Sequence, residues 1–185
     1  ASVTAWLWSE PGVPGASTVW IRARNANGEV TAERTVGVAD VREPRPVDSL
    51  EVDLTGMSEF FAWDLAWYGA DGELIDRDIQ LASRSDSFTA VLDEPATIEV
   101  TTGLIGDTVH VTVSHSGGPM AVGLRLLDAR ESADAGWIGF SGDPRPLLPG
   151  ETRILTADFS NAAGRRRVAL EGLNVPVIEF DPEMW

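Results

Sequence analysis

The sequence predicts an all-β protein built from two tandem antiparallel β-sandwich domains, and three observations lead to this fold class. Short segments rich in Val, Thr, Ile, Trp and Phe alternate apolar and polar residues, as strands with one buried face do. Eighteen glycines and eleven prolines separate these segments. No stretch longer than about ten residues has the 3.6-residue periodicity of an amphipathic helix. Short strands in this spacing are typical of immunoglobulin-like sandwiches.

The first half of the chain contains two predicted β-hairpins. Their strands and turns are expected over residues 17–24, 25–28 and 29–38 in the first hairpin, and over 59–68, 69–72 and 73–81 in the second. Alternation places Val19 and Ile21 on one face, which we expect to be buried. Trp63 and Trp67 share a face with Phe61, so they are predicted to belong to the core.

The second half continues with strand patterns separated by turns. Strands are expected over residues 97–101, 107–115, 120–127, 151–159 and 165–172. A proline-rich segment at 143–150 precedes the last two of them. The polar stretch 83–87 is the predicted domain break, which gives immunoglobulin-like sandwiches over 1–83 and 84–185. One larger continuous sandwich stays open as the alternative.

Composition excludes several classes of function. The chain has 29 acidic and 14 basic residues, a formal net charge of −15, and no cysteine. Disulfides, cysteine-based zinc sites and thiol nucleophiles are therefore impossible. Nucleic acid is not expected as a partner, because binding phosphates requires a positive surface. No apolar run approaches the ~20 residues that span a bilayer, so no membrane partner is predicted.

No catalytic residue, cofactor or metal ion is predicted within this chain. The acidic residues lie mostly in turns or on polar strand faces, and Asp71 beside Gly72 is interpreted as part of a turn rather than a calcium ligand. His110 and His115 are five residues apart on one strand, so they project to opposite faces. Both are expected to be surface or rim histidines. No nucleotide-binding loop, zinc-protease motif or nucleophile elbow is present.

Tryptophan is the one unusual feature, with seven residues. Trp20 shares a strand face with Arg22 and Arg24, opposite the predicted core face. Trp6 and Trp8 share a face with Thr4. Outward-facing tryptophans mark interfaces or ligand sites. The sequence therefore predicts an interdomain or sugar-contact surface made of Trp6, Trp8, Trp20, Arg22 and Arg24.

Several motifs of the second half carry a resemblance to a known family. They are Phe-Thr-Ala-Val-Leu at 88–92, Ala-Thr-Ile-Glu-Val at 96–100, Leu-Leu-Pro-Gly-Glu at 147–151 and Val-Ala-Leu-Glu-Gly-Leu-Asn-Val at 168–175. Their order resembles the C-terminus of β-mannosidase-like enzymes of glycoside hydrolase family 2, which include exo-β-glucosaminidase relatives. The first half resembles the immunoglobulin-like domain that precedes it. One departure is the segment 141–146, where the family has an Asn-Tyr-Phe-like sequence.

The resemblance implies that this chain is a non-catalytic C-terminal part of a larger exo-glycosidase. In such enzymes two glutamates on a (β/α)8 barrel of about 250 residues hydrolyse terminal β-linked sugars with retention, and nothing here supplies that barrel. The expected partners are the barrel and other domains of the parent chain, and carbohydrate is a possible weak ligand. The strand-like sequence at the very start agrees with a fragment. A cytoplasmic and a secreted parent both stay open, since no signal-peptide pattern begins this segment.

Three other functions stay open, and an independent enzyme ranks last among them. The tryptophans are compatible with a carbohydrate-binding module. A pair of immunoglobulin-like domains also serves as a general interaction module in many proteins.

Overall fold

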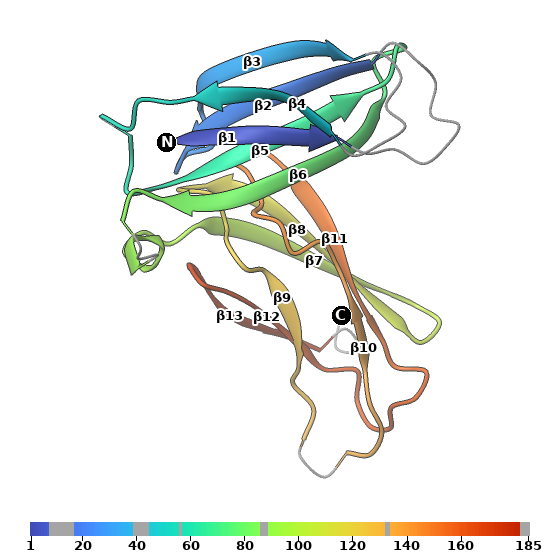
Figure 1. Cartoon of the computed structure of the whole chain (residues 1–185). Helices are drawn as coiled ribbons and strands as arrows, with labels where there is room; N and C mark the ends of the chain where they lie inside the picture. Colours follow the sequence, from blue (N-terminus) through green and yellow to red (C-terminus); the bar gives the residue numbers. More distant parts are fainter. Residues whose placement is uncertain (8–16, 39–44, 56, 86–88, 132–133, 182–185) are drawn as a thin grey trace. The chain divides into compact units, whose positions relative to one another are not determined.

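The computed structural model describes residues 1–7, 17–38, 45–55, 57–85, 89–131 and 134–181. Its regular structure is antiparallel β-sheet, with one short 3₁₀ helix, η1 (Thr89–Leu92), which confirms the predicted fold class (Figure 1). No helix in the described ranges is long and apolar enough to cross a membrane. The chain divides into two compact units, Ala1–Phe88 and Thr89–Trp185. The sequence places the break five residues earlier, at 83/84.

Unit 1 contains two antiparallel sheets. A two-stranded sheet pairs β1 (Ser2–Leu7) with β4 (Arg45–Glu51). The four-stranded sheet has the order β3-β2-β5-β6, with β2 (Ser17–Asn25), β3 (Val30–Val38), β5 (Phe60–Tyr68) and β6 (Leu74–Ser83). Both predicted hairpins are therefore present, with ends that differ from the predicted ones by one or two residues.

The turns of both hairpins are set by glycine and by short hydrogen bonds. Gly28 has a φ of 78° and its N–H donates to the Asn25 carbonyl at 2.9 Å. Gly72 has a φ of 81°, a conformation that side chains disfavour. The Asp71 carboxylate accepts the Glu73 N–H at 3.0 Å, so this carboxylate closes the turn.

The core of unit 1 lies between its two sheets. Val19, Ile21 and Ala23 of β2 are buried there, as alternation predicts. Phe61, Trp63 and Trp67 of β5 belong to the same cluster, and Ala5 of β1 and Leu50 of β4 close it from the other sheet. The prediction that Trp63 and Trp67 are core residues is confirmed.

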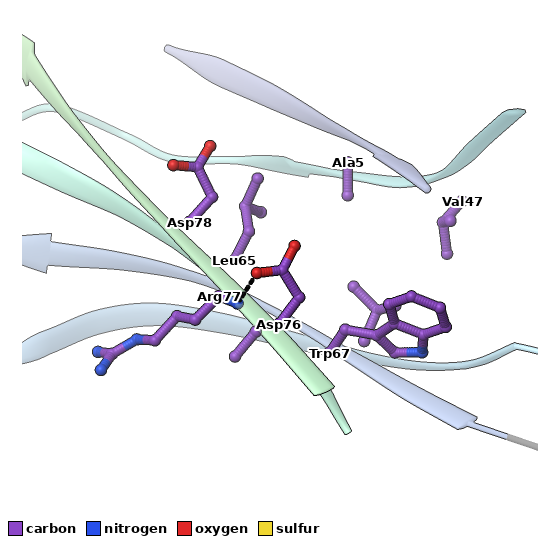
Figure 2. A pocket seen from close by; sticks show the side chains of 9 residues that line it. Ala5, Val47, Leu65, Trp67, Asp76, Arg77 and Asp78 are labelled. Atoms are coloured by element: carbon purple, nitrogen blue, oxygen red, sulfur yellow. Dashed lines mark hydrogen bonds between the residues drawn. The ribbon is translucent and has the colours of Figure 1, made fainter. Parts of the chain in front are cut away.

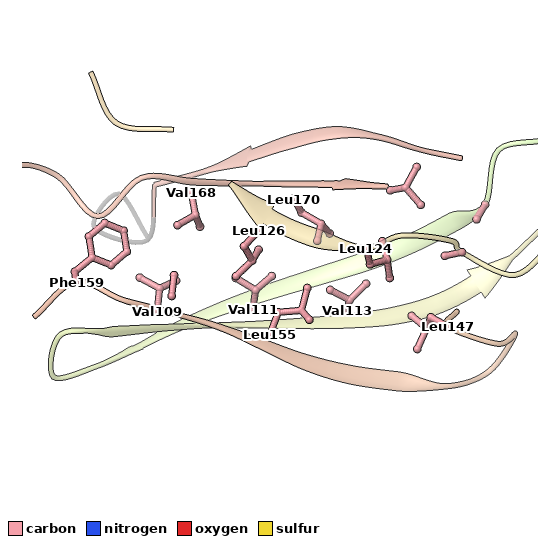
Figure 3. Packing of buried hydrophobic residues seen from close by; sticks show 14 residues of the cluster. Val109, Val111, Val113, Leu124, Leu126, Leu147, Leu155, Phe159, Val168 and Leu170 are labelled. Atoms are coloured by element: carbon pink, nitrogen blue, oxygen red, sulfur yellow. The ribbon is translucent and has the colours of Figure 1, made fainter. Parts of the chain in front are cut away.

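Unit 2 is also a sandwich. Its four-stranded sheet has the order β10-β11-β8-β7, formed by β7 (Thr97–Ile105), β8 (Thr108–Gly117), β10 (Gly139–Ser141) and β11 (Thr152–Asp158). The facing sheet has the order β13-β12-β9, formed by β9 (Arg125–Asp128), β12 (Val168–Gly172) and β13 (Val175–Phe180). Inward residues of both sheets meet in one core, with Val109, Val111 and Val113 of β8 opposite Val168 and Leu170 of β12 (Figure 3).

One predicted strand is substantially shorter than expected. The apolar run 120–127 predicts a strand along its whole length, but only its end belongs to β9. Ala121 instead makes an isolated bridge to Leu147, with N–O distances of 2.9 and 2.8 Å in the two directions. The prediction for the start of this run was wrong because its backbone groups pair with the proline-rich segment rather than with a sheet.

Two polar side chains fix the loops of unit 2. Asn174, which is buried, accepts the Val122 N–H and donates to the Met120 carbonyl, both at 3.0 Å. Arg153 donates to the carbonyls of Asp143 at 2.9 Å and Pro146 at 3.2 Å. The closing Asn of the resemblance motif and the divergent segment 141–146 are thus both tied to the body of the sandwich.

Candidate functional site: the outer face of the first sandwich

The alternation of β2 places three of the predicted site residues together on the outer face of the four-stranded sheet. Val19 and Ile21 point into the core, so Trp20, Arg22 and Arg24 point the other way. On β5 their partners in register are Ala66, Asp64 and Ala62, respectively. All three site residues are half-buried. The outer face therefore has one aromatic residue and two cations along a single strand.

Asp64 lies at the centre of this face and holds two arginines. Its side chain has no exposed surface, and one oxygen accepts the Arg24 Nε–H at 2.7 Å. Arg77 of β6 donates to both carboxylate oxygens, from Nε at 2.7 Å and from Nη2 at 3.0 Å. Burial raises the pKa of Asp64, but the hydrogen bonds and charges of Arg77 and Arg24 outweigh this effect and hold it below its ordinary value. The carboxylate is therefore ionised and positions both guanidinium groups.

An aromatic pair lies beside this ionic cluster. Trp20 and Tyr68 meet edge to face, with ring centroids 6.0 Å apart. The Arg22 guanidinium carbon is 3.9 Å from the Trp20 ring centroid, and its Nε donates to Glu33 at 2.6 Å. A cation held over a ring in this way orients the indole. Together, Trp20, Tyr68, Arg22, Arg24, Asp64 and Arg77 form what we call the Trp20 face.

The structure describes only part of the predicted site. It brings Trp20, Arg22 and Arg24 together. Trp6 belongs to β1, opposite Pro46, but its side chain lies outside the described part of the chain. Trp8 lies outside the described residues altogether. Whether these two tryptophans join the surface stays a prediction.

Sequence reasoning missed three members of the Trp20 face. Asp64 and Tyr68 lie on the face of β5 opposite Trp63 and Trp67, and Arg77 lies on β6. A signal for Asp64 was present, since one carboxylate within the otherwise apolar segment Phe60–Tyr68 requires a cation when buried. The partner could not be chosen among 14 arginines without the strand register.

The histidines do not form a site. His110 and His115 do project to opposite faces of β8, as predicted. His115, however, is only 4% exposed, and its Nε2 lies 2.7 Å from the Pro119 carbonyl. The prediction that it is a surface residue was wrong, because it continues the inward series of Val109, Val111 and Val113. Within the described residues, no three His, Asp or Glu side chains converge in a geometry that could hold a metal ion.

The fold is similar to part of a solved glycosidase. The crystal structure of the exo-chitosanase CsxA from Amycolatopsis orientalis matches with a TM-score of 0.59 at 15% identity. A complex of a CsxA variant with PNP-β-D-glucosamine matches with a TM-score of 0.60 at 14% identity. Both matches cover 91% of this chain and 24% of that chain, so this chain spans about a quarter of the enzyme's length. No family model matches the sequence, and no curated protein is significantly similar to it. At these identities the comparison establishes the fold.

Proposed function

We propose that this chain is a non-catalytic accessory part of a larger exo-glycosidase of glycoside hydrolase family 2. The observation that carries the proposal is the match of 91% of the chain to a quarter of an exo-chitosanase. The order of the motifs ending in Glu171-Gly172-Leu173-Asn174 supports it independently. In this proposal the parent enzyme hydrolyses terminal β-linked sugars with two glutamates on a separate barrel, by the retaining route.

The subtype belongs to the proposal as well. The resemblance of the motifs includes both β-mannosidases and exo-β-glucosaminidases. The similar structures are of an enzyme described as an exo-β-D-glucosaminidase, which supports the second of these. The sugar itself is chosen by residues of the barrel, which this chain does not contain.

We assign the Trp20 face the role of an interdomain surface in the parent. Arg22 and Arg24 lie beside an aromatic pair, and arginine with aromatic residues is enriched in protein interfaces. The charges of Arg22 and Arg24 are partly balanced by Glu33 and Asp64. The face can therefore pack against another domain without burying much uncompensated positive charge. The barrel or a neighbouring domain of the parent is the expected partner.

A direct experiment tests this function. The coding sequence upstream of Ala1 should encode a barrel of about 250 residues in the same reading frame. The purified chain should hydrolyse none of the aryl β-mannoside, β-glucosaminide, β-galactoside and β-glucuronide substrates. An open reading frame that starts near Ala1 contradicts the proposal. Turnover that survives repurification, and that is lost when one acid of this chain is replaced, contradicts it as well.

A carbohydrate-binding module is the second candidate, because the Trp20–Tyr68 pair offers aromatic surface on which a sugar ring can stack. Titration with manno-oligosaccharides and chito-oligosaccharides, followed by tryptophan fluorescence, distinguishes the two. Saturable binding at millimolar sugar that Trp20→Ala abolishes favours the binding module. The absence of any response favours the interdomain surface. Trp137→Ala is a matched control, because Trp137 is 63% exposed and belongs to unit 2.

A further inference from the structure

The hairpin turn between β2 and β3 contains an asparagine that is followed by glycine. The chain has four asparagines, at positions 25, 27, 161 and 174, and only Asn27 precedes a glycine, Gly28. The backbone nitrogen of the next residue can attack a side-chain amide. Glycine hinders this attack least, because it has no Cβ and permits the widest range of backbone angles. The sequence therefore singles out Asn27 among the asparagines.

The structure leaves the side chain of Asn27 without a constraint. Asn27 is exposed, and within the described residues its carboxamide makes no hydrogen bond. Asn25 of the same turn, in contrast, accepts the Glu29 N–H at 3.0 Å and donates from Nδ2 to the Glu29 carboxylate at 2.7 Å. The Ala26 N–H, which would attack Asn25, donates to Ser58 Oγ at 3.0 Å. The two asparagines of this turn therefore differ in their freedom to react.

The asparagines of unit 2 are also less suited to this attack. Asn174 is buried, and its side chain forms the two hydrogen bonds described above. Asn161 is exposed, but Ala162 follows it, and the Ala162 N–H donates to the Phe159 carbonyl at 2.9 Å. Asn161 is therefore an internal comparison, because it shares the exposure of Asn27 but has no glycine after it.

The attacking nitrogen at Asn27 is held while the turn is closed. The Gly28 N–H donates to the Asn25 carbonyl at 2.9 Å, and Gly28 has a φ of 78°. The attack therefore requires a brief opening of the turn. Opening an exposed hairpin end locally costs much less free energy than unfolding the domain.

We propose that Asn27 is a site of spontaneous modification through a cyclic succinimide. The Gly28 nitrogen loses its proton to hydroxide and forms a bond with Asn27 Cγ, while the Cγ–Nδ2 bond breaks and ammonia leaves. Water then opens the ring at one of its two carbonyl carbons. The products are aspartate and isoaspartate, and in isoaspartate the backbone continues through Cγ. Both products add one negative charge to the turn.

The same turn holds an arginine of the Trp20 face. Arg24 donates from Nη1 to the Gly28 carbonyl and from Nε to Asp64, both at 2.7 Å. Arg77 binds Asp64 as well and extends away from Asp76 on the neighbouring strand position (Figure 2). Isoaspartate lengthens the backbone before Gly28 by one methylene group, so it displaces this carbonyl from Arg24. The modification thus removes one of the two groups that position the Arg24 guanidinium.

Peptide mapping tests the modification. The whole chain is incubated in mildly alkaline buffer and cleaved after arginine, which releases residues 25–34 as one peptide. Tandem mass spectrometry should locate the mass gain of an NH2-to-OH exchange at Asn27. We expect a rate at least about tenfold higher than at Asn161, which corresponds to a barrier lower by ~1.4 kcal/mol. Asn27→Gln should abolish the gain, because its longer side chain cannot form the succinimide.

Two results overturn the proposal. One is a folded chain that stays unmodified at Asn27 while a synthetic peptide of residues 25–34 is converted, since the closed turn would then prevent the attack. The other is an equal rate at Asn27 and Asn161, since glycine and the unconstrained side chain would then have no effect.

NMR tests the consequence for Arg24. The Arg24 Nε–H resonance, assigned with Arg24→Gln, should shift in the isoaspartate form after its separation by ion exchange. Asn27→Asp is the matched control, because it adds the same charge without lengthening the backbone, and its shift should be smaller. The indole resonances report whether each form remains folded. Equal shifts in the isoaspartate form and in folded Asn27→Asp contradict the displacement of the Gly28 carbonyl.

Discussion

The Asp64 carboxylate of β5 accepts two hydrogen bonds from Arg77 of β6, one at 2.7 Å from Nε and one at 3.0 Å from Nη2. Both residues lie on the outer face of the sheet, where Arg24 completes a three-residue cluster. A fully buried carboxylate is tolerated there because two cations compensate the loss of hydration. This cluster joins β2, β5 and β6, and it holds the guanidinium groups of Arg24 and Arg77 in place on the Trp20 face.

Asp64→Asn should destabilise unit 1 by about 3 kcal/mol, because it leaves two partly buried guanidinium groups without their counter-charge. Urea unfolding followed by circular dichroism measures this change. Asp48→Asn is the control, since the Arg34–Asp48 pair is more exposed and screened by solvent, and its loss should have a much smaller effect on stability. Equal effects of the two replacements would contradict the role assigned to Asp64.

Acid should weaken unit 2 through Asp143. A hydrogen bond from the Arg145 side chain, with the Arg145 N–H and the charge of Arg153, lowers the pKa of Asp143 from 3.8 to about 2. Because the folded pKa is depressed, the ionised carboxylate stabilises the fold above pH 3.8, and this contribution is lost as the pH falls toward 2. Asp143→Asn should therefore flatten the decrease of the free energy of unfolding in this interval. Parallel pH profiles for variant and parent would show that the carboxylate does not contribute.

Asn174→Ala should destabilise unit 2 by about 2 kcal/mol. The replacement leaves the buried Val122 N–H and Met120 carbonyl without their side-chain partner. Chemical unfolding of the whole chain measures the loss in the transition that belongs to unit 2. Asn161→Ala, an exposed asparagine of the same unit, should change stability by less than about 0.5 kcal/mol. If Asn174→Ala leaves the free energy of unfolding unchanged, other groups must form hydrogen bonds with the Val122 N–H and the Met120 carbonyl.

The two units should fold independently. Each has its own core, one between the two sheets of unit 1 and one between those of unit 2. We expect residues 1–88 and 89–185, expressed separately, to give dispersed NMR spectra, and limited proteolysis of the whole chain to cut first near 83–87. A single cooperative calorimetric transition, together with a protease-resistant 83–87 segment, would favour one continuous folding unit.

The strand faces and the turns depend on residues that are close in the sequence, so the sequence alone predicted them. Strand alternation has a period of two, so Val19 and Ile21 could be assigned to the core, and Trp20 and Arg22 to the other face, without any tertiary information. The turns at Gly28 and Gly72 follow from the φ values that glycine permits. The same alternation applied to His115 would have placed it with Val109, Val111 and Val113, in the core.

Tertiary structure decided what depends on pairing between distant segments. The Asp64–Arg24 contact joins residues 40 positions apart. The register of β2 on β5 places Arg22 directly opposite Asp64 and Arg24 one same-face position along, so only the packed side chains decide that Arg24 is the partner. The start of the apolar run 120–127 likewise belongs to no sheet, because Ala121 pairs with the distant Leu147 in an isolated bridge. The register of β6 on β5 likewise decides that Asp76 pairs with Trp67 and Asp78 with Leu65. The period-two alternation of a strand predicts which of its residues share a face. The hydrogen bonds between strands decide which other residues that face contacts.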